Sequence, residues 1–363
     1  MRTLIFFVLA LLLPTPASAA TPDDVLQLSS GPSRIYIETL PDRQDLNFEL
    51  FLRNKGAAPL SLRRLQVSVR DSAGRLLERR LLDGNGVRPS IHTLPARDVP
   101  AGGTLTMFNP FPSFGRELQI GSLQFDMTLS GDAKDAPEIV RSIEVKPVAR
   151  QGLTALVLPV RGRMINYDGH DALAHHRRFD YSFAPLAQMG FKSNFMRYGY
   201  DFVPVDEDGE MAHGDLSRNE NYVGFGAPVR ATGDGVIVAM ENGQPDNRNF
   251  DQSKIPQDPM VLFGNHAVID HGNGEFSVYG HLKQGSVQVK AGDRVRRGQT
   301  IAAIGASGSA FFPHLHYQLQ DGPTLVAEGL PSHFDEFRVL RGASVQRLQR
   351  ATVDTGQIVE SIR

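Results

Sequence analysis

Residues 311–319 read FFPHLHYQL and place two histidines, His314 and His316, at alternate positions of an apolar, aromatic-rich run. Side chains at positions i and i+2 of a β-strand leave it on the same face, roughly 6.5–7 Å apart along the strand. Two imidazoles in this arrangement can both contact one small ligand. The alternative is a solvated strand face, on which two polar residues simply alternate with Leu315 and Tyr317. The rest of the chain has to decide between these interpretations.

The sequence on either side of this run predicts a protein built from β-strands. The chain has 35 glycines, 23 prolines and few long helical periods, which indicates turns between many short strands. Period-two alternation of apolar residues predicts an immunoglobulin-like β-sandwich over residues 25–148, a binding or spacer module without catalytic side chains. Similar alternation predicts a second, antiparallel β domain over residues 153–340. We expect residues 341–363 to be a C-terminal extension.

The first twenty residues predict a cleavable secretory signal. One early cation, Arg2, precedes an apolar stretch over residues 4–13, and Pro14 and the small residues 17–19 follow it. This stretch is too short to cross roughly 30 Å of hydrocarbon as a helix, and no later segment approaches the required length. We therefore expect an exported, periplasmic protein with no membrane span in the mature chain.

The composition narrows the chemistry that the chain can perform. Cysteine is absent, so the chain has no disulfide and no cysteine-linked lipid anchor, and any metal must be held by histidines and carboxylates. The formal net charge is -2, and no basic stripe indicates a nucleic-acid partner. Ten of the eleven histidines follow residue 153. Metal chemistry is therefore expected in the second half.

Four side chains of this half are candidates for a hydrolytic metal centre. Such a centre needs three protein ligands and an open position for water, whose pKa the metal lowers. Asp201 lies in the alternating run RYGYDF, His281 ends the strand FSVYGHL, and His314 and His316 form the pair described above. Each residue alone has an ordinary explanation, such as a turn aspartate or a locally satisfied imidazole. Together they have the composition of a metal hydrolase.

Residues 195–321 resemble the lysostaphin/LytM-type zinc metallopeptidases, which are bacterial cell-wall endopeptidases. The resemblance lies in the order and spacing of RYGYDF, GAPVRATGDGVI, VIDHGNGEFSVYGHL and VKAGDRVRRGQTIAAIGASGSAFFPHLHYQL. It implies a compact antiparallel β domain of lysostaphin type, a duplicated hybrid motif with zinc in a groove. It also implies that Asp201 and His316 are metal ligands, and that His281 and His314 are catalytic, activating water and stabilising the oxyanion. The implied substrate is the peptide of peptidoglycan.

One position departs from the pattern of this family. The family's first ligand is a histidine four residues before the aspartate, and that residue here is Arg197, whose guanidinium has no lone pair to donate. Under a first hypothesis, a histidine of the irregular segment 162–190 is the third ligand instead. The candidates are His170, His175 and His176, of which we prefer His176.

Under a second hypothesis the metal is lost or weakly held. Arg197 would then form a bidentate ion pair with Asp201, and the groove would only bind peptide or glycan. Degenerate relatives of the resembled family activate other cell-wall hydrolases, so the partner would be another envelope hydrolase. The joint presence of the four candidates favours a zinc endopeptidase acting on peptidoglycan, because a pure binding groove has no physical need of all four.

Overall fold

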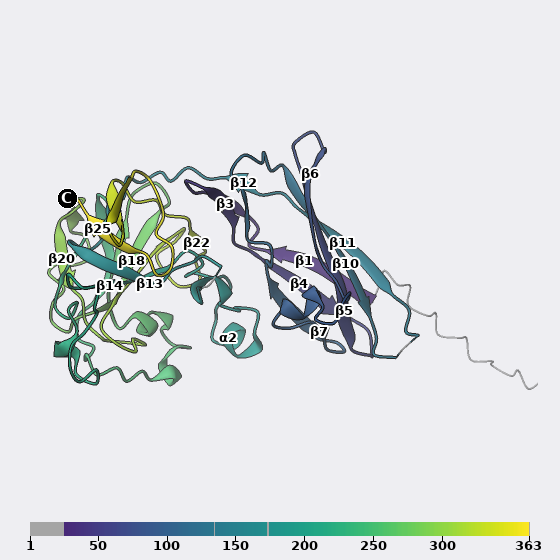
Figure 1. Ribbon diagram of the computed structural model, residues 1–363. Coiled ribbons are helices and arrows are strands. Elements are labelled where there is room, and N and C mark those ends of the chain that lie inside the picture. Colours follow the sequence, from purple (N-terminus) through teal and green to yellow (C-terminus); the bar gives the residue numbers. More distant parts are fainter. Residues whose placement is uncertain (1–24, 134, 173, 363) are drawn as a thin grey trace, which may run out of the picture.

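A computed structural model describes the chain over residues 25–133, 135–172 and 174–362 (Figure 1). The predicted signal over residues 1–20 lies outside these ranges. Within them most regular structure is β-strand, which confirms the all-β prediction. None of the helices found there is long and apolar enough to cross a membrane. The helical segments are η1 (Ser90–Thr93), η2 (His176–Arg178), α2 (Ala184–Gln188), η3 (Asn219–Asn221), η4 (Gln252–Lys254) and η5 (Pro259–Phe263).

Strands β1 to β12 form three small sheets at one end of the molecule (Figure 1). Their orders are β1-β4-β8, β11-β10-β5-β6 with β7 paired to β5, and β12-β2-β3-β9. The strands are β1 (Leu26–Gly31), β2 (Tyr36–Thr39), β3 (Arg43–Leu46), β4 (Glu49–Asn54), β5 (Leu60–Arg70), β6 (Leu76–Leu82), β7 (Asp98–Val99), β8 (Thr104–Phe108), β9 (Ser113–Gly115), β10 (Ser122–Ser130), β11 (Ile139–Val145) and β12 (Val148–Ala149).

These sheets share one hydrophobic core, and we call strands β1 to β12 the N-terminal sandwich. Leu50 and Leu52 of β4 belong to the same buried cluster as Val67 of β5 and Phe125 of β10. The rings of Phe48 and Phe125 meet edge to face, with centroids 5.9 Å apart. Alternating apolar residues of facing sheets thus fill one interior, as the period-two pattern predicts. The more specific immunoglobulin-like assignment and the division into domains at residues 148–153 stay predictions.

The second half is built on one large sheet with the order β19-β16-β17-β18-β21-β14-β13-β25-β23-β24, in which β22 also pairs with β21. A separate pair is formed by β15 and β20. The strands are β13 (Arg163–Asp168), β14 (Tyr200–Pro204), β15 (Pro228–Arg230), β16 (Gly235–Glu241), β17 (Asn265–Asp270), β18 (Phe276–Leu282), β19 (Arg294–Val295), β20 (Thr300–Ala303), β21 (Leu315–Gln320), β22 (Gly329–Leu330), β23 (Phe337–Arg341), β24 (Ser344–Leu348) and β25 (Ile358–Ser361).

The C-terminal residues complete this sheet. Strand β25 pairs antiparallel with β13 on one side and with β23 on the other. Residues beyond 341, predicted as an extension, are therefore continuous with the sheet that carries β14 and β21.

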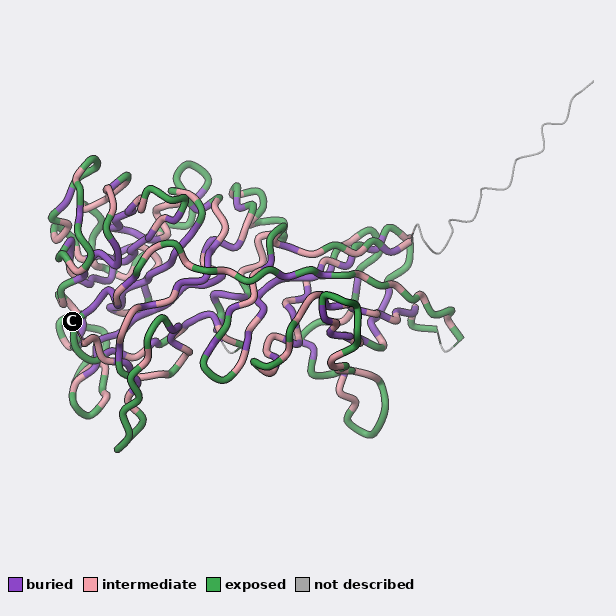
Figure 2. Tube along the Cα trace, turned by 90° about the horizontal axis from the view of Figure 1, so that it is seen from above, coloured by how far each residue is buried: buried purple, intermediate pink, exposed green. Residues whose placement is uncertain are grey.

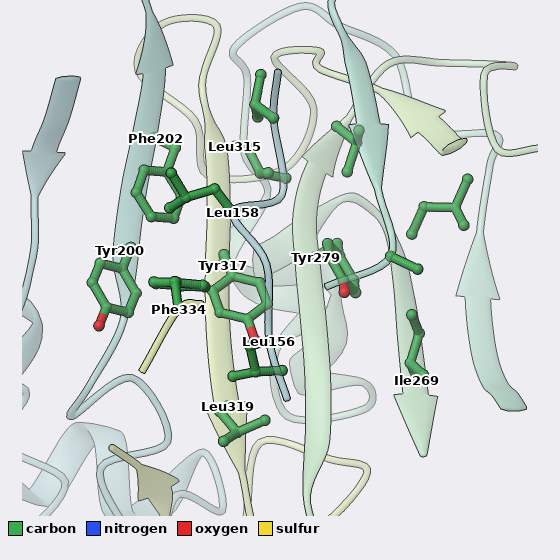
Figure 3. Packing of buried hydrophobic residues seen from close by; sticks show 14 of the residues in the cluster. Leu156, Leu158, Tyr200, Phe202, Ile269, Tyr279, Leu315, Tyr317, Leu319 and Phe334 are labelled. Atoms are coloured by element: carbon green, nitrogen blue, oxygen red, sulfur yellow. The ribbon is translucent and has the colours of Figure 1, made fainter. Parts of the chain in front are cut away.

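Apolar side chains from one face of the sheet form the core of this half (Figure 3). Tyr200 and Phe202 of β14 lie beside Leu315 and Tyr317 of β21, and all four are fully buried. The Phe334 ring packs against Tyr200 and Tyr317, with centroid distances of 5.3 Å and 5.6 Å. Buried stretches run through both ends of the molecule, whereas exposed residues concentrate at loop tips (Figure 2). The position of this core determines which side chains face the opposite side of the sheet.

Candidate metal centre

The other face of β14 and β21 carries the polar residues of the site. Asp201 stands directly opposite His316 in the antiparallel register of the two strands. Because side chains alternate, both leave the sheet on the side away from Tyr200. Strand β18 places Gly280 opposite His316 from the other edge, and His281 follows it. The run FFPHLHYQL thus includes a central strand with one apolar and one polar face.

His176, Asp201 and His316 form a group that could hold a metal ion, with one ligand atom from each lying within 4.8 Å of the others. His176 Nε2 is 3.5 Å and His316 Nδ1 is 2.9 Å from the same oxygen, Asp201 Oδ1. All three residues are buried. Two imidazoles and one carboxylate are a donor set that suits zinc and leaves a coordination position for water.

His176 belongs to η2, which lies in the connection between β13 and β14. Its Nδ1 donates a hydrogen bond to Gly169 O at 2.9 Å, and Asn194 donates to His176 O at 2.9 Å. Gly199 permits the close approach of the segment to the sheet. A Cβ atom at this position would lie 3.3 Å from both His176 Nδ1 and His316 Cε1. A larger residue at 199 would therefore press on both imidazoles.

Neighbouring oxygen atoms determine which nitrogen of each imidazole carries the hydrogen and which keeps its lone pair. The carbonyl of Gly169 can only accept, so Nδ1 of His176 carries the hydrogen and Nε2 keeps its lone pair. At His316 the amide oxygen of Gln318 lies 2.8 Å from Nε2, which leaves the Nδ1 lone pair facing Asp201. Two nitrogen lone pairs therefore face one carboxylate. A cation between them would turn this repulsion into attraction, so the residues present fit a divalent metal.

Two buried glutamines behind His316 were not identified from the sequence. Gln318 donates to the amide oxygen of Gln320, and the amide nitrogen of Gln320 donates to Gly322 O at 2.6 Å. Both glutamines are fully buried. Partners of this kind fix the tautomer and the ring orientation of a ligating histidine. The continued alternation His-x-His-x-Gln-x-Gln along one face is the signal that could have found them.

His281 and His314 lie together beside the group, with ring centroids 4.7 Å apart. Each donates its Nδ1 hydrogen to a carbonyl oxygen at 2.9 Å, that of Ser307 and that of Phe312 respectively, so each keeps a lone pair on Nε2. His314 Nε2 is 3.5 Å from Asp201 Oδ1. The backbone of His281 has a φ of 60°, in the left-handed region that residues other than glycine seldom adopt. Strained residues of this kind cluster at functional sites.

Burial and neighbouring charges determine the protonation of the site. Burial alone would raise the pKa of Asp201, but the imidazoles of His176 and His314 lower it well below its usual value. Burial lowers the pKa of His281 far below the usual range and also lowers that of His314. The site therefore combines an ionised Asp201 carboxylate with His281 and His314, whose imidazoles burial favours in the neutral form.

Residues 222–327 match the model of peptidase family M23. This part of the chain is similar to M23 peptidase domains. This confirms the family predicted from the sequence segments. The matched range contains His281, His314 and His316, whereas His176 and Asp201 lie before it.

Relatives of the M23 domain include two proteins with assigned roles. Peptidoglycan DD-endopeptidase ShyA of Vibrio cholerae is 32% identical over 127 residues, which are 35% of this chain and 24% of ShyA. Murein hydrolase activator EnvC of Escherichia coli is 31% identical over 86 residues, 24% of this chain and 20% of EnvC. The chain thus spans about a quarter or less of the length of these relatives. Among solved structures, the catalytic domain of lysostaphin from Staphylococcus simulans is 24% identical and covers 36% of this chain and 74% of its own, with a TM-score of 0.24.

Arg197 lies away from the carboxylate with which the second hypothesis paired it. Its Nη1 donates to Glu49 Oε1 at 2.6 Å and its Nε donates to Glu328 Oε1 at 2.5 Å. The predicted ion pair between Arg197 and Asp201 is therefore wrong. Two other carboxylates hold the guanidinium, and Asp201 faces imidazoles instead.

The two other histidines considered as third ligand lie outside the metal-binding group. His170 is buried against the N-terminal sandwich, where its Nε2 is 3.0 Å from Glu38 Oε1. His175 is mostly exposed and contacts Asp168 through Nδ1. Although the rings of His175 and His176 lie close together, with centroids 4.3 Å apart, the Nδ1 of His175 contacts Asp168 and not Asp201. Of the three candidates, the structure brings His176 to Asp201 and His316.

The Glu38–His170 pair predicts a pH-dependent contribution to stability. Burial alone would raise the pKa of Glu38, but His170, with His333 and Arg43, lowers it below 4.5. Burial alone would lower the pKa of His170, but Glu38, with Asp171 and Asp354, raises it above 6.5. The contribution of Glu38 is lost as pH falls through its lowered pKa, and that of His170 is lost as pH rises through its raised pKa. The pair therefore stabilises the fold most between about pH 4.5 and 6.5.

Replacing Glu38 with glutamine should lower the free energy of unfolding by roughly 1.5–3 kcal/mol within this window, the usual range for a hydrogen bond to a charged group. Thermal unfolding of both proteins from pH 3 to 9 measures the difference. A difference in Tm that is constant across this range would contradict an ionised pair.

The pocket around the group is small and largely apolar. Its volume is about 140 Å³. Phe263 stacks on the His316 ring with a centroid distance of 5.2 Å, while Phe311 at the mouth is 86% exposed. Other lining residues are His175, His176, Phe195, Met196, Asp201, Leu262, His281, Ser309 and His314. Apolar walls around a few convergent polar groups are typical of small-molecule and peptide sites.

Proposed function

We propose that this protein is a zinc-dependent endopeptidase that hydrolyses peptide bonds of peptidoglycan. The observation that carries the proposal is the placement of His176 beside Asp201 and His316, which supplies the third ligand that Arg197 cannot provide. The similarity to ShyA, a peptidoglycan DD-endopeptidase, supports the substrate class.

Zinc would be held by His176 through Nε2, by the Asp201 carboxylate and by His316 through Nδ1. When bound, zinc supplies Lewis acidity, which lowers the pKa of water and polarises the scissile carbonyl. Gly169 and Gln318 hold the two ligating imidazoles in the required tautomers. The lowered pKa of Asp201 keeps this ligand ionised over the ordinary pH range.

His281 and His314 would perform the proton transfers. Both are neutral near pH 7 because burial lowers their pKa values, so each can accept at Nε2 the proton that the attacking water loses. A ring protonated there becomes a hydrogen-bond donor to the oxyanion that develops on the substrate carbonyl. The same proton can then pass to the leaving amine. The carbonyl partners of Nδ1 keep both rings oriented through these steps.

We further propose that the protein acts in the cell envelope after export to the periplasm. The N-terminal signal pattern supports export, and the peptidoglycan-directed relatives support the compartment. In this proposal residues 25–148 form the sandwich module and residues 153–340 the peptidase domain.

A non-catalytic role is the second candidate, because EnvC is named a murein hydrolase activator. Such a protein would bind peptidoglycan or another envelope hydrolase without needing a metal. The intact donor set around Asp201 favours the enzyme over this alternative.

Metal analysis and digestion of purified sacculi test the proposal. The purified full chain should contain about one zinc per molecule, as a single three-ligand site requires. It should release soluble peptides from sacculi, lose this activity with a chelator and regain it when zinc is restored. Metal-free protein that binds sacculi equally well with and without chelator would contradict the enzyme. Stimulation of a second hydrolase by that metal-free protein would indicate the activator.

A further inference from the structure

The segment that carries His176 lies against the N-terminal sandwich. Arg177, the next residue, donates to Asn109 O at 3.2 Å. Further along, Asp180 accepts a hydrogen bond from Thr106, and the Tyr181 ring meets the Phe51 ring at 6.1 Å. These contacts come from β4, from β8 and from the residue after β8, none of which contributes to the metal-binding group.

Two buried ion pairs join the same interface, one from a residue before His176 in the sequence and one from a residue after it. Before it, His170 pairs with Glu38 of β2. After it, Arg197 pairs with Glu49 at the start of β4, and the side chains of Arg197 and Glu49 are fully buried. A buried guanidinium is tolerated only when carboxylates surround it, so Arg197 depends on the sandwich for one of its two partners.

The side chain of Asn47 in the sandwich also contacts the backbone on both sides of His176. It donates to Arg197 O at 2.8 Å and to His170 O at 3.5 Å, and so joins the two ends of the segment to the sandwich. Arg197 in turn bonds through its backbone N–H to Asn194 O, and Asn194 donates to His176 O. Two hydrogen bonds therefore connect the residue held by Glu49 to the residue that faces Asp201.

We propose that the N-terminal sandwich positions the third metal ligand, with Glu49 and Arg197 as positioning residues that hold the 169–199 segment against the sheet. The inference rests on the proposed function, because it concerns the affinity of the same metal site. It changes the predicted role of the sandwich from a separate binding or spacer module to a part of the metal centre.

The physical reason is preorganisation. Among the residues that the structure describes between 169 and 199, the regular structure consists of the short helices η2 and α2, so contacts outside the segment have to keep His176 in place. If those contacts weaken, His176 samples other positions, and metal binding has to order it again at the expense of affinity. Two ligands, Asp201 and His316, would remain fixed by the sheet in either case.

A matched pair of variants on β4 tests this inference. Glu49 and Asn54 are both fully buried at opposite ends of the strand, but Asn54 bonds within the sandwich, to Ala58 O and Val99 O. Zinc affinity is measured on the full-length apoproteins by competition with a chromophoric chelator. Glu49→Gln should weaken zinc binding about 10-fold or more, within the 10–100-fold range typical of outer-shell partners. Asn54→Ala should lower Tm but leave zinc affinity within about 2-fold of the wild type.

Hydrogen exchange gives a second readout that does not depend on activity. Amides of residues 174–180 should exchange faster in Glu49→Gln than in Asn54→Ala, and zinc should restore their protection. If Glu49→Gln does not fold, Glu38→Gln at the other end of the interface replaces it, with the same two expectations.

The outcomes separate this inference from the proposed function. Equal zinc affinity in wild type and Glu49→Gln, with unchanged exchange at residues 174–180, would overturn the positioning role while leaving the enzyme in place. An equal loss of zinc affinity in Glu49→Gln and Asn54→Ala would also overturn the positioning role, because general destabilisation of the fold would then explain the loss. A wild-type protein that binds no zinc would overturn both proposals.

Discussion

Replacing His281 with alanine should reduce kcat for sacculus digestion by about 10²–10⁴-fold, the usual contribution of a general acid–base group. The zinc content should stay at that of the wild type, because His281 is outside the group formed by His176, Asp201 and His316. The fold should also persist, since alanine removes one imidazole ring from the lining of the pocket and leaves the apolar core of the sheet unchanged. Metal analysis, circular dichroism and initial rates on the same preparation measure the three quantities.

The control for this experiment is the affinity for substrate. A large rise in KM with unchanged kcat would show that His281 contributes to binding alone, and the catalytic role would then be rejected. An equal fall in kcat and kcat/KM is the result expected of a group that acts in the transition state.

The second large effect concerns the third ligand. Replacing His176 with alanine should weaken zinc binding by more than about 100-fold. Loss of a residue that only hydrogen-bonds to a ligand typically lowers metal affinity 10–100-fold, and loss of the ligand itself should lower it further. Activity at limiting zinc should fall in parallel. Titration of the apoprotein with zinc in the presence of a competing chelator provides the measurement.

His175 offers a matched control for His176. It is the adjacent histidine, is mostly exposed and faces Asp168. His175→Ala should therefore keep the zinc affinity of the wild type. If His175→Ala and His176→Ala lost zinc equally, or if only His175→Ala lost it, the assignment of the third ligand would have to be abandoned.

The strands and the family could be predicted from sequence because their signals are local. Alternation of apolar residues places Tyr200, Phe202 and Leu315 on one face, and the same alternation assigns Asp201 and His316 to the other. The all-β class and the family are confirmed. The catalytic and ligand roles of Asp201, His281, His314 and His316 stay predictions that the geometry supports.

The surroundings of Arg197 could not be predicted because its partners are remote in the chain. Glu49 lies 148 positions earlier and Glu328 lies 131 positions later. The nearest carboxylate in sequence, Asp201, was the natural but wrong choice of partner. Likewise, the sequence of residues 162–190, predicted to be irregular, shows no periodicity that would identify which of its histidines faces the sheet, although its first residues form β13. Only the packing of the sandwich against this segment distinguishes His176 from His170.

The long separation of the proposed ligands along the chain has a consequence for maturation. Asp201 and His316 are 115 residues apart, and His176 approaches them from a loop that packs on the sheet. Closing such long loops is slow and entropically unfavourable, so the ion cannot nucleate the polypeptide as it does in a zinc finger. Under the proposed function, the metal would then bind after the chain has folded, and a cell short of zinc would accumulate folded protein without its ion.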